Sequence, residues 1–351
     1  LARQAEDSET ASSAWMELSS LARSQGDYAG AQTQAQRALD VLGDGNHTAR
    51  AFALMELAKS RGFLEGMDLG RTLASEAVAE MELAGSQISR FEQAQLLRSL
   101  AQICWWHGDV QMAIAHGEDA LNRIPVPQSP LAAEILLTLA TPCLYRHEIE
   151  RAYGYAISAL AICEQLVVKE LLPTALTTLG NILTRMGRLD DAEVNLHRAI
   201  ELASDLGVAR YAQVMAAGYL AYAQFMRGRV QEAIQTAETA LWSYEGLPVV
   251  YEVYVCRSVL ADSYLSDGQT LKAERIFEAL LELGERRQYR IPLAMVYFGL
   301  AYIRMKAGSR EQGIELAERS LEYLQPSRAW ELFVDQGERA QVVCSALAER
   351  Q

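Results

Sequence analysis

Apolar side chains between residues 177 and 203 recur at steps of three and four, interrupted by one short polar break. This spacing places them on one face of a helix, so the stretch predicts two helices that each bury one side. The first stripe contains Leu179, Ile182, Leu183 and Met186, and the second contains Leu189, Ala192, Leu196, Ala199, Ile200 and Ala203. The short break between the stripes predicts a helical hairpin.

The break, MGRLDDA, carries the signals of a helix end followed by a helix start. Gly187 can adopt the left-handed conformation that closes a helix. Asp190 is expected to cap the next helix, with Glu193 three residues on as in a capping box. The turn chemistry therefore agrees with the apolar pattern.

The same unit recurs along the chain at a step of about 40 residues. Eight copies align on one turn position, which is a glycine in all copies but the fourth. These positions are Gly26, Gly62, Gly108, His147, Gly187, Gly228, Gly268 and Gly308. An isolated copy cannot bury its apolar face, so we expect the copies to stack on one another in an all-α fold.

Small residues follow the turn at two fixed places, five and twelve positions on. They are Ala31 and Ala38, Ala113 and Ala120, Ala152 and Ala159, Ala192 and Ala199, and Ala233 and Ala240. We expect the two helices of a hairpin to cross there too closely for a larger side chain. Repeats two, seven and eight depart from this rule, with Met67, Leu280, Gly313 and Ser320 at those places.

This pattern resembles the tetratricopeptide repeat, whose consensus combines a bulky residue, Leu-Gly, a tyrosine-like position, the turn glycine and two alanines. Matching residues are Trp15, Leu18, Gly26, Tyr28, Ala31 and Ala38 in the first copy, and Leu176, Leu179, Gly180, Gly187, Ala192 and Ala199 in the fifth. The resemblance implies a right-handed superhelical solenoid whose first helices line the concave surface. Because the prolines between hairpins suit helix starts, we expect residues 1–325 to form one repeat domain.

Residues 326–351 are expected to form a capping segment of the same domain. Val342, Val343, Ala346 and Leu347 suit a terminal helix that covers the last repeat. The stretch LFVDQGERAQVVCSAL also resembles the segment that ends the repeat region of MalT-like, large ATP-binding regulators of the LuxR family. The residues that carry this resemblance are Phe333, Val334, Asp335, Gly337 and Glu338.

In that family a nucleoside-triphosphatase module precedes the repeats, and a helix-turn-helix DNA-binding module follows them. These 351 residues contain no GxxxxGK[ST] loop and no Gly-Lys dipeptide. The resemblance therefore implies the sensor region of such a regulator, with the flanking modules in the full-length chain.

Charge and composition indicate which partners and which cellular compartment to expect. The formal net charge is −13, and an acidic surface repels phosphate backbones, so we expect no direct nucleic acid binding. No apolar run reaches the length of a membrane helix and no secretion signal opens the chain, which predicts a cytoplasmic protein without membrane association. The cysteines lack metal-ligand spacing and are expected to be reduced and buried. They are Cys104, Cys143, Cys163, Cys256 and Cys344.

Catalytic chemistry is not indicated. The histidines lie on different turns and helices, at His47, His107, His116, His147 and His197. No HExxH, GxSxG or strand-borne GxGxxG motif occurs. We therefore expect a non-catalytic protein with no cofactor and no metal site.

Recognition is expected in the concave groove, through repeat positions that face away from the partner helix. Those positions give Arg98, Gln102, Trp106, Thr177, Asn181, Arg185, Tyr222, Asp262 and Tyr302 as candidate ligand-binding residues. They also give Glu56, Lys59 and Lys306, whereas Trp105, Phe225 and Phe298 are expected to fill the core. Asn181 is also where peptide-binding members of the repeat class hold a ligand backbone, a role that the resemblance implies. The lysine-rich carboxylate clamp of chaperone-binding members is not reproduced, because lysine is nearly absent.

Two functions remain open. The first is a sensor domain that binds a small-molecule effector or a protein partner in its groove and biases contacts to flanking modules. The second is a free-standing tetratricopeptide-repeat scaffold that binds peptides or proteins.

The predicted crossing positions can be tested by overpacking. Replacing Ala192 or Ala199 with leucine should lower the free energy of unfolding by roughly 1 to 3 kcal/mol, because the added methyl groups have no space between the helices. Urea denaturation measures this, and neutral results at both positions would contradict the repeat register.

Overall fold

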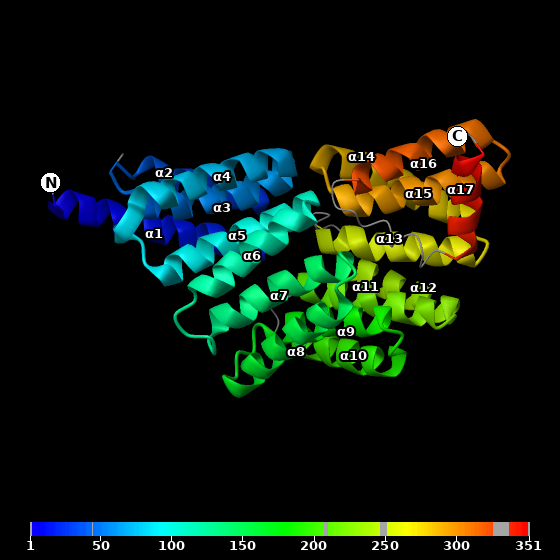
Figure 1. The fold of residues 1–351 in the computed structure, drawn as a ribbon, viewed down its shortest axis with the longest axis horizontal. Coiled ribbons are helices and arrows are strands. Elements are labelled where there is room, and N and C mark those ends of the chain that lie inside the picture. The colour runs from blue at the N-terminus through cyan, green and yellow to red at the C-terminus, as the bar shows by residue number, and fades with distance from the viewer. Residues whose placement is uncertain (1, 44, 207–209, 246–250, 326–336, 350–351) are drawn as a thin grey trace. The chain divides into compact units, whose positions relative to one another are not determined.

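A computed structural model describes residues 2–43, 45–206, 210–245, 251–325 and 337–349. Within these ranges the regular elements are all helices, and α1 to α16 form eight consecutive hairpins (Figure 1). The predicted all-α repeat fold is thereby confirmed. The chain divides into two compact units, Leu1–Leu139 and Ala140–Gln351.

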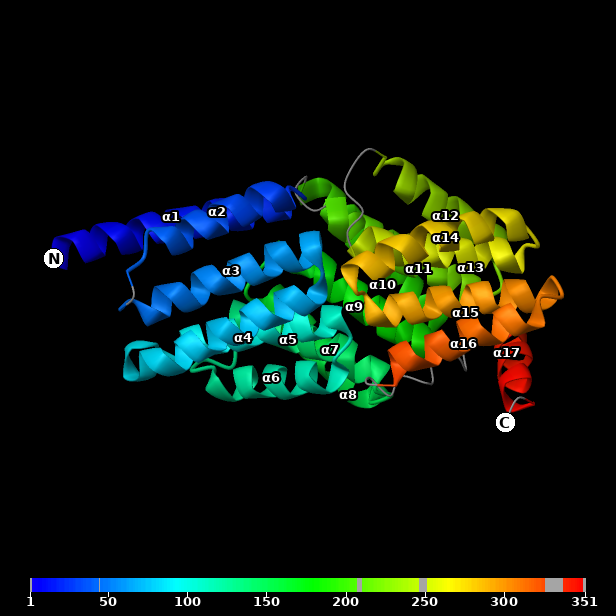
Figure 2. The same cartoon turned by 90° about the horizontal axis from the view of Figure 1, so that it is seen from above.

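The first unit contains three complete hairpins and most of a seventh helix. Its helices are α1 (Ala2–Ser24), α2 (Tyr28–Asp40), α3 (His47–Glu65), α4 (Met67–Ala84), η1 (Gly85–Gln87), α5 (Arg90–His107) and α6 (Val110–Arg123), and the division falls within α7 (Pro130–Tyr145). Figure 2 shows α3 and α4 running side by side within this unit.

The second unit continues the same alternation of first and second helices. It contains α8 (Ile149–Gln165), α9 (Leu172–Arg185), α10 (Leu189–Leu206), α11 (Arg210–Met226), α12 (Val230–Trp242), α13 (Tyr251–Ser266), α14 (Thr270–Arg287), α15 (Arg290–Lys306), α16 (Arg310–Leu324) and α17 (Glu338–Ala348). The predicted capping helix is α17, which packs on α15 and α16. The single domain predicted over residues 1–325, with its tail, and the handedness of the array stay predictions.

The turn between the two helices of a hairpin repeats almost unchanged. Its central residue has a positive φ in seven hairpins, between 65° at His147 and 92° at Gly108. The next residue donates its backbone N–H to a carbonyl five residues back, as Asp109 does to Cys104 at 2.8 Å. This closure turns the chain sharply into the second helix.

The second repeat is an exception that corrects the sequence alignment. Gly62 lies inside α3, and the turn falls at Gly66, which has a φ of 134°. A Cβ on Gly70 would stand 2.9 Å from the Gly62 Cα, so these two glycines let α3 and α4 approach closely. Gly62 is therefore a packing residue rather than the turn.

The capping prediction at Asp190 is also wrong. Helix α10 already begins at Leu189, so Asp190 lies in its first turn, and its carboxylate accepts from Arg227 at 2.5 Å. In two other hairpins the residue directly after the turn glycine is the cap: Asp27 accepts from the Gly30 N–H, and Asp109 accepts from the Met112 N–H. The capping place belongs to that earlier position, which is arginine in this hairpin.

The small residues after the turn are buried as predicted. Nine of the ten alanines have no exposed surface, and Ala240 alone is partly exposed. Leu280, Gly313 and Ser320 are buried too, so repeats seven and eight bury different side chains at the same places. Met67 is also buried, but it directly follows the turn at Gly66 and so does not occupy the predicted crossing position. Four cysteines are buried as well, whereas Cys344 on α17 is exposed, which corrects the expectation for that residue.

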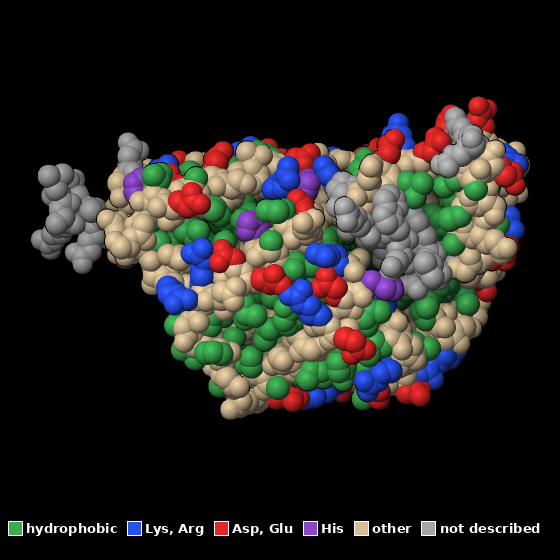
Figure 3. Space-filling model, in the orientation of Figure 1, with side chains coloured by type: hydrophobic (Ala, Val, Ile, Leu, Met, Phe, Trp, Pro, Cys, Tyr) green, Lys and Arg blue, Asp and Glu red, His purple; other side chains and the backbone are tan. Residues whose placement is uncertain are grey.

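Charged residues lie mostly at the surface, where they pair with one another. Acidic and basic side chains are interspersed over the face drawn in Figure 3. Arg188 with Asp191 at 2.7 Å and Arg151 with Glu148 at 2.8 Å are examples. Such exposed pairs each contribute at most about 1 kcal/mol, so the fold rests on the buried helix contacts.

Two helical glycines provide a matched test of those contacts. A Cβ on Gly180 would stand 2.5 Å from the Cγ of buried Leu196, whereas a Cβ on the exposed Gly154 meets nothing within 4 Å. Gly154→Ala should stabilise the protein by roughly 0.5 to 1 kcal/mol through its better helix propensity. Gly180→Ala should instead destabilise it by about 1 kcal/mol or more because overpacking exceeds that gain. Equal effects in thermal or urea unfolding would contradict the close approach of α9 and α10.

Candidate ligand-binding site

The second unit contains a hollow of about 100 Å³ whose described lining comes from first helices of hairpins, namely α7, α9, α11, α13 and α15. Its lining consists of Tyr145, Asn181, Arg185, Tyr219, Tyr222, Tyr251, Val255, Ser258, Val259, Asp262, Ile291, Pro292 and Met295. We call this the tyrosine hollow. It combines apolar walls with a few polar groups, as small-ligand sites do.

Repeat geometry explains how residues distant in sequence meet in the hollow. Asn181, Tyr222 and Asp262 each stand six positions before the turn glycine of their own hairpin. Because each hairpin repeats the last, this position recurs at the same place on α9, α11 and α13. Asn181, Arg185, Tyr222 and Asp262 are the predicted site residues that the structure brings together here.

Arg185 is held by aromatic rings. Its guanidinium carbon lies 5.2 Å from the centre of the Tyr145 ring and 5.7 Å from that of Tyr222. Both distances fall within the range of cation–π attraction, which also orients the guanidinium plane. The hollow thus presents a positioned cation beside aromatic surface.

Asn181 supplies a different feature. Its side chain is only 3 % exposed, and its Oδ1 has no hydrogen-bond partner among the described residues. A buried acceptor without a donor costs about 1 to 3 kcal/mol, so such groups are uncommon in folded proteins. An N–H or O–H group of a ligand would satisfy this oxygen.

Ionisable groups around the hollow have shifted pKa values. Burial raises the pKa of the Tyr219 and Tyr251 hydroxyls, which keeps both neutral. Burial also raises the pKa of Glu252 to about 6. The tyrosines can therefore donate as well as accept hydrogen bonds at neutral pH.

Asp262 has a charged partner on another helix. Its Oδ1 accepts from the guanidinium of Arg339, a residue of α17 that is 7 % exposed. Burial raises the pKa of the Asp262 carboxyl, and the adjacent Arg339 acts against that rise. Asp262 thus lines the hollow, and Arg339 of α17 pairs with its carboxylate.

Two further predicted residues of the second unit lie outside the hollow. Thr177 is buried, and its hydroxyl donates to the Pro173 carbonyl at 2.7 Å. Tyr302 lines a separate depression with Phe225 and Arg339, and the Lys306 ammonium lies 5.5 Å from its ring centre. Phe298 is in the core as predicted, whereas Phe225 is partly exposed.

The remaining predicted residues belong to the first unit. Arg98 pairs with Glu134 at 3.1 Å, Gln102 is partly exposed, and Trp106 packs edge-on against Phe63 with 4.7 Å between ring centres. Trp105, expected in the core, is also partly exposed.

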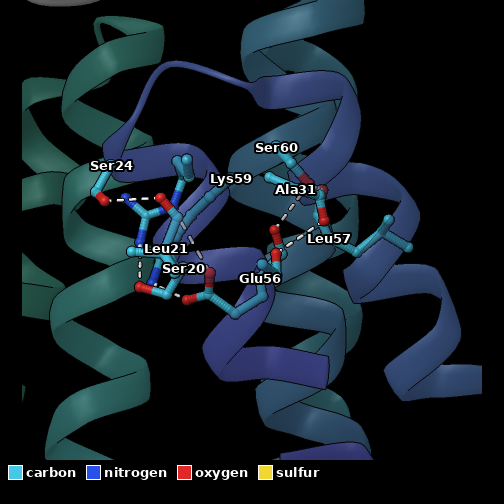
Figure 4. Close-up of polar contacts among 10 residues, drawn as sticks. Ser20, Leu21, Ser24, Ala31, Glu56, Leu57, Lys59 and Ser60 are labelled. Atoms are coloured by element: carbon cyan, nitrogen blue, oxygen red, sulfur yellow. Dashed lines mark hydrogen bonds and ion pairs between the residues drawn. The ribbon is translucent and has the colours of Figure 1, made fainter. Parts of the chain in front are cut away.

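A partly buried charge cluster lies on the first helices of this unit. Lys59 donates to Glu56 at 2.7 Å, and the Arg23 Nε lies 3.6 Å from the second oxygen of the same carboxylate. Figure 4 shows the Glu56 and Lys59 side chains within this network. Burial lowers the pKa of Lys59 to about 8, against the attraction of Glu56. The members of the cluster therefore pair with one another.

Several lining residues were not among the predicted site residues. Tyr219 lies one helical turn before Tyr222, so the same periodicity could have identified it. Tyr251 and Pro292 come from the first turns of α13 and α15. Their place in the hollow depends on how successive hairpins stack, which periodicity within one hairpin does not define.

Other site types are not evident in the part of the chain described. No group of three or more His, Cys, Asp or Glu side chains is arranged there to hold a metal ion. None of the described helices is both long and apolar enough to cross a membrane. Phe333, Val334 and Asp335, which carry part of the tail resemblance, lie outside the described residues.

Comparison with known proteins agrees with this architecture. The hairpins define a tetratricopeptide-repeat protein. The chain belongs to the MalT-like TPR region family, whose pattern matches residues 18–350. No curated protein sequence matches the chain.

Solved structures share the fold at low sequence identity. A Rap protein complexed with Competence and Sporulation Factor aligns with a TM-score of 0.63 and 16 % identity, covering 99 % of this chain and 100 % of the other. A STAND signal-transduction ATPase with a tetratricopeptide repeat sensor, from Pyrococcus horikoshii, aligns with a TM-score of 0.55 and 15 % identity. That alignment covers 90 % of this chain and 47 % of the ATPase, so the chain spans about half of that protein's length.

The raised pKa of Glu252 predicts a pH-dependent stability. Its folded value of about 6 exceeds the ordinary 4.5, so the stability that it contributes is present below pH 4.5 and is lost as the pH rises through 6. Glu252→Gln should therefore match the parent at low pH and be more stable by about 2 kcal/mol above neutrality. Urea unfolding across this range measures the difference, with the exposed Glu150→Gln as control. A pH-independent difference would contradict the burial of a charged Glu252.

Proposed function

We propose that this chain is the non-catalytic sensor region of a MalT-like transcription regulator of the LuxR family, and that its effector binds in the tyrosine hollow. The unpartnered, buried Oδ1 of Asn181 is the main observation in support. Arg185 and the surrounding tyrosines add a positioned cation and aromatic surface beside it. Together they favour recognition of a ligand over a purely structural role.

The lining indicates what the bound group would look like. It would donate one hydrogen bond to Asn181 and place an apolar or aromatic part against Val255, Val259 and Met295. An acceptor or anionic group would face Arg185. A hollow of about 100 Å³ suits a small effector or one side chain of a protein partner.

The proposal places this region between two other modules in a full-length, cytoplasmic protein. A nucleoside-triphosphatase module would precede it, and a DNA-binding module would follow α17. The family match and the likeness to an ATPase with a tetratricopeptide repeat sensor support this arrangement. Nucleic acid contact would then belong to the following module, because this region is acidic.

A free-standing scaffold is the second candidate. The observation that favours it is the end-to-end alignment with a Rap protein solved in complex with a signalling factor. Sequencing the native transcript and co-purifying partners of the native protein separates the two, because a scaffold would lack both flanking modules.

A ligand screen with matched variants tests the site. Calorimetry and thermal-shift screening of metabolites and peptides should find a ligand whose affinity falls about tenfold or more in Asn181→Ala and Tyr222→Ala, since each loses a contact worth roughly 1.4 kcal/mol. Thr174→Ala, on the exposed side of α9, should bind like the parent. If both hollow variants fold and bind any discovered ligand with parental affinity, the assignment of the hollow is wrong.

A further inference from the structure

One buried cation, Arg339, links helix α17 to the hairpins of the second unit. The Arg339 guanidinium donates to the Asp262 carboxylate, to the Ser266 hydroxyl at 3.2 Å and to the Asp262 carbonyl at 3.4 Å. Its central carbon also lies 5.9 Å from the centre of the Phe225 ring. These contacts reach α13 and α11, which lie far back in the chain from α17.

The other charged links of α17 are exposed. Lys306 pairs with Glu338 at 2.9 Å, and Arg310 pairs with Glu349, with all four side chains more than half exposed. Exposed pairs of this kind contribute little, whereas breaking a buried pair leaves an uncompensated charge. Among the described charged contacts of α17, the Arg339 pair is therefore the one that fixes its docking.

The partner of Arg339 is at the same time part of the ligand site. Asp262 lines the tyrosine hollow together with Asn181, Arg185 and Tyr222. While α17 is docked, Arg339 neutralises the Asp262 carboxylate. If α17 leaves, that carboxylate loses its paired cation, and Arg185 is then the basic residue of the described lining that shares the hollow with it.

We propose that Asp262 couples the ligand-binding hollow to the docking of α17, so that the charge of the ligand determines whether the C-terminal helix stays in place. This inference rests on the proposed function of the hollow. A neutral or anionic ligand binds better when Arg339 neutralises Asp262, and a cationic ligand binds better when it does not. Ligand binding and α17 docking affect each other equally, because linkage is reciprocal. An anionic ligand therefore stabilises docked α17, and a cationic ligand favours its release.

The contribution of the Arg339–Asp262 pair to the docking of α17 is tested first without any ligand, by hydrogen exchange of the α17 backbone amides. Arg339→Met and Asp262→Asn should each speed exchange in α17 about tenfold or more, while the rest of the second unit keeps its protection. Arg310→Met removes an exposed α17 pair and should change exchange little. Equal exchange in Arg339→Met and Arg310→Met would show that the Arg339–Asp262 pair does not fix the docking of α17.

The coupling is tested with two probes of the same shape and opposite charge, phenylacetate and phenethylamine, titrated at about pH 8. The parent should bind phenylacetate more tightly, and Arg339→Met should lower the phenylacetate-to-phenethylamine affinity ratio about tenfold. Arg310→Met should keep the parental ratio. An unchanged ratio in Arg339→Met, despite faster α17 exchange, would overturn the coupling.

Failure of the ligand site is distinguishable from failure of the coupling. If neither probe binds the parent, the proposed function fails for this ligand class, and the coupling is decided by fluorine NMR of 3-fluorotyrosine at Tyr222, assigned with Tyr222→Phe. A shifted Tyr222 signal in Arg339→Met, with a parental signal in Arg310→Met, supports the coupling. Parental signals in both variants contradict it.

Discussion

The close approach of two helices at fully buried small residues is the constraint on which the rest of the structure depends. Alanines five and twelve positions after the turn have almost no exposed surface, and a methyl group on Gly180 would meet Leu196. Because each hairpin packs so tightly against itself, its remaining side chains keep a constant direction from one repeat to the next. Equivalent positions of successive hairpins therefore face in equivalent directions.

The tyrosine hollow follows from that regularity. The place six residues before the turn brings Asn181, Tyr222 and Asp262 onto neighbouring helices of the second unit. None of these residues is remarkable in its own hairpin. Their proposed role arises from repetition, which lines up a buried acceptor, an aromatic ring and a carboxylate in the same hollow as Arg185.

Much of this was predictable from sequence, because the signals are local and repeated. The turns, the buried alanines and the first-helix location of Asn181 depend on spacings within one hairpin. Gly66 was missed as a turn because Gly62 fits the same spacing and packs against Gly70 instead. The ion pair of Asp262 with Arg339, 77 residues apart, has no local signal and depends on where α17 docks.

We propose that the first helices of the second unit form the effector site. Hydrogen exchange of the protein with and without an effector found by screening tests this most directly. The account predicts slower exchange in the parts of α9, α11 and α13 that line the tyrosine hollow, and little change in α10, α12 and α14. Protection confined to those second helices, or to the first unit, would contradict it.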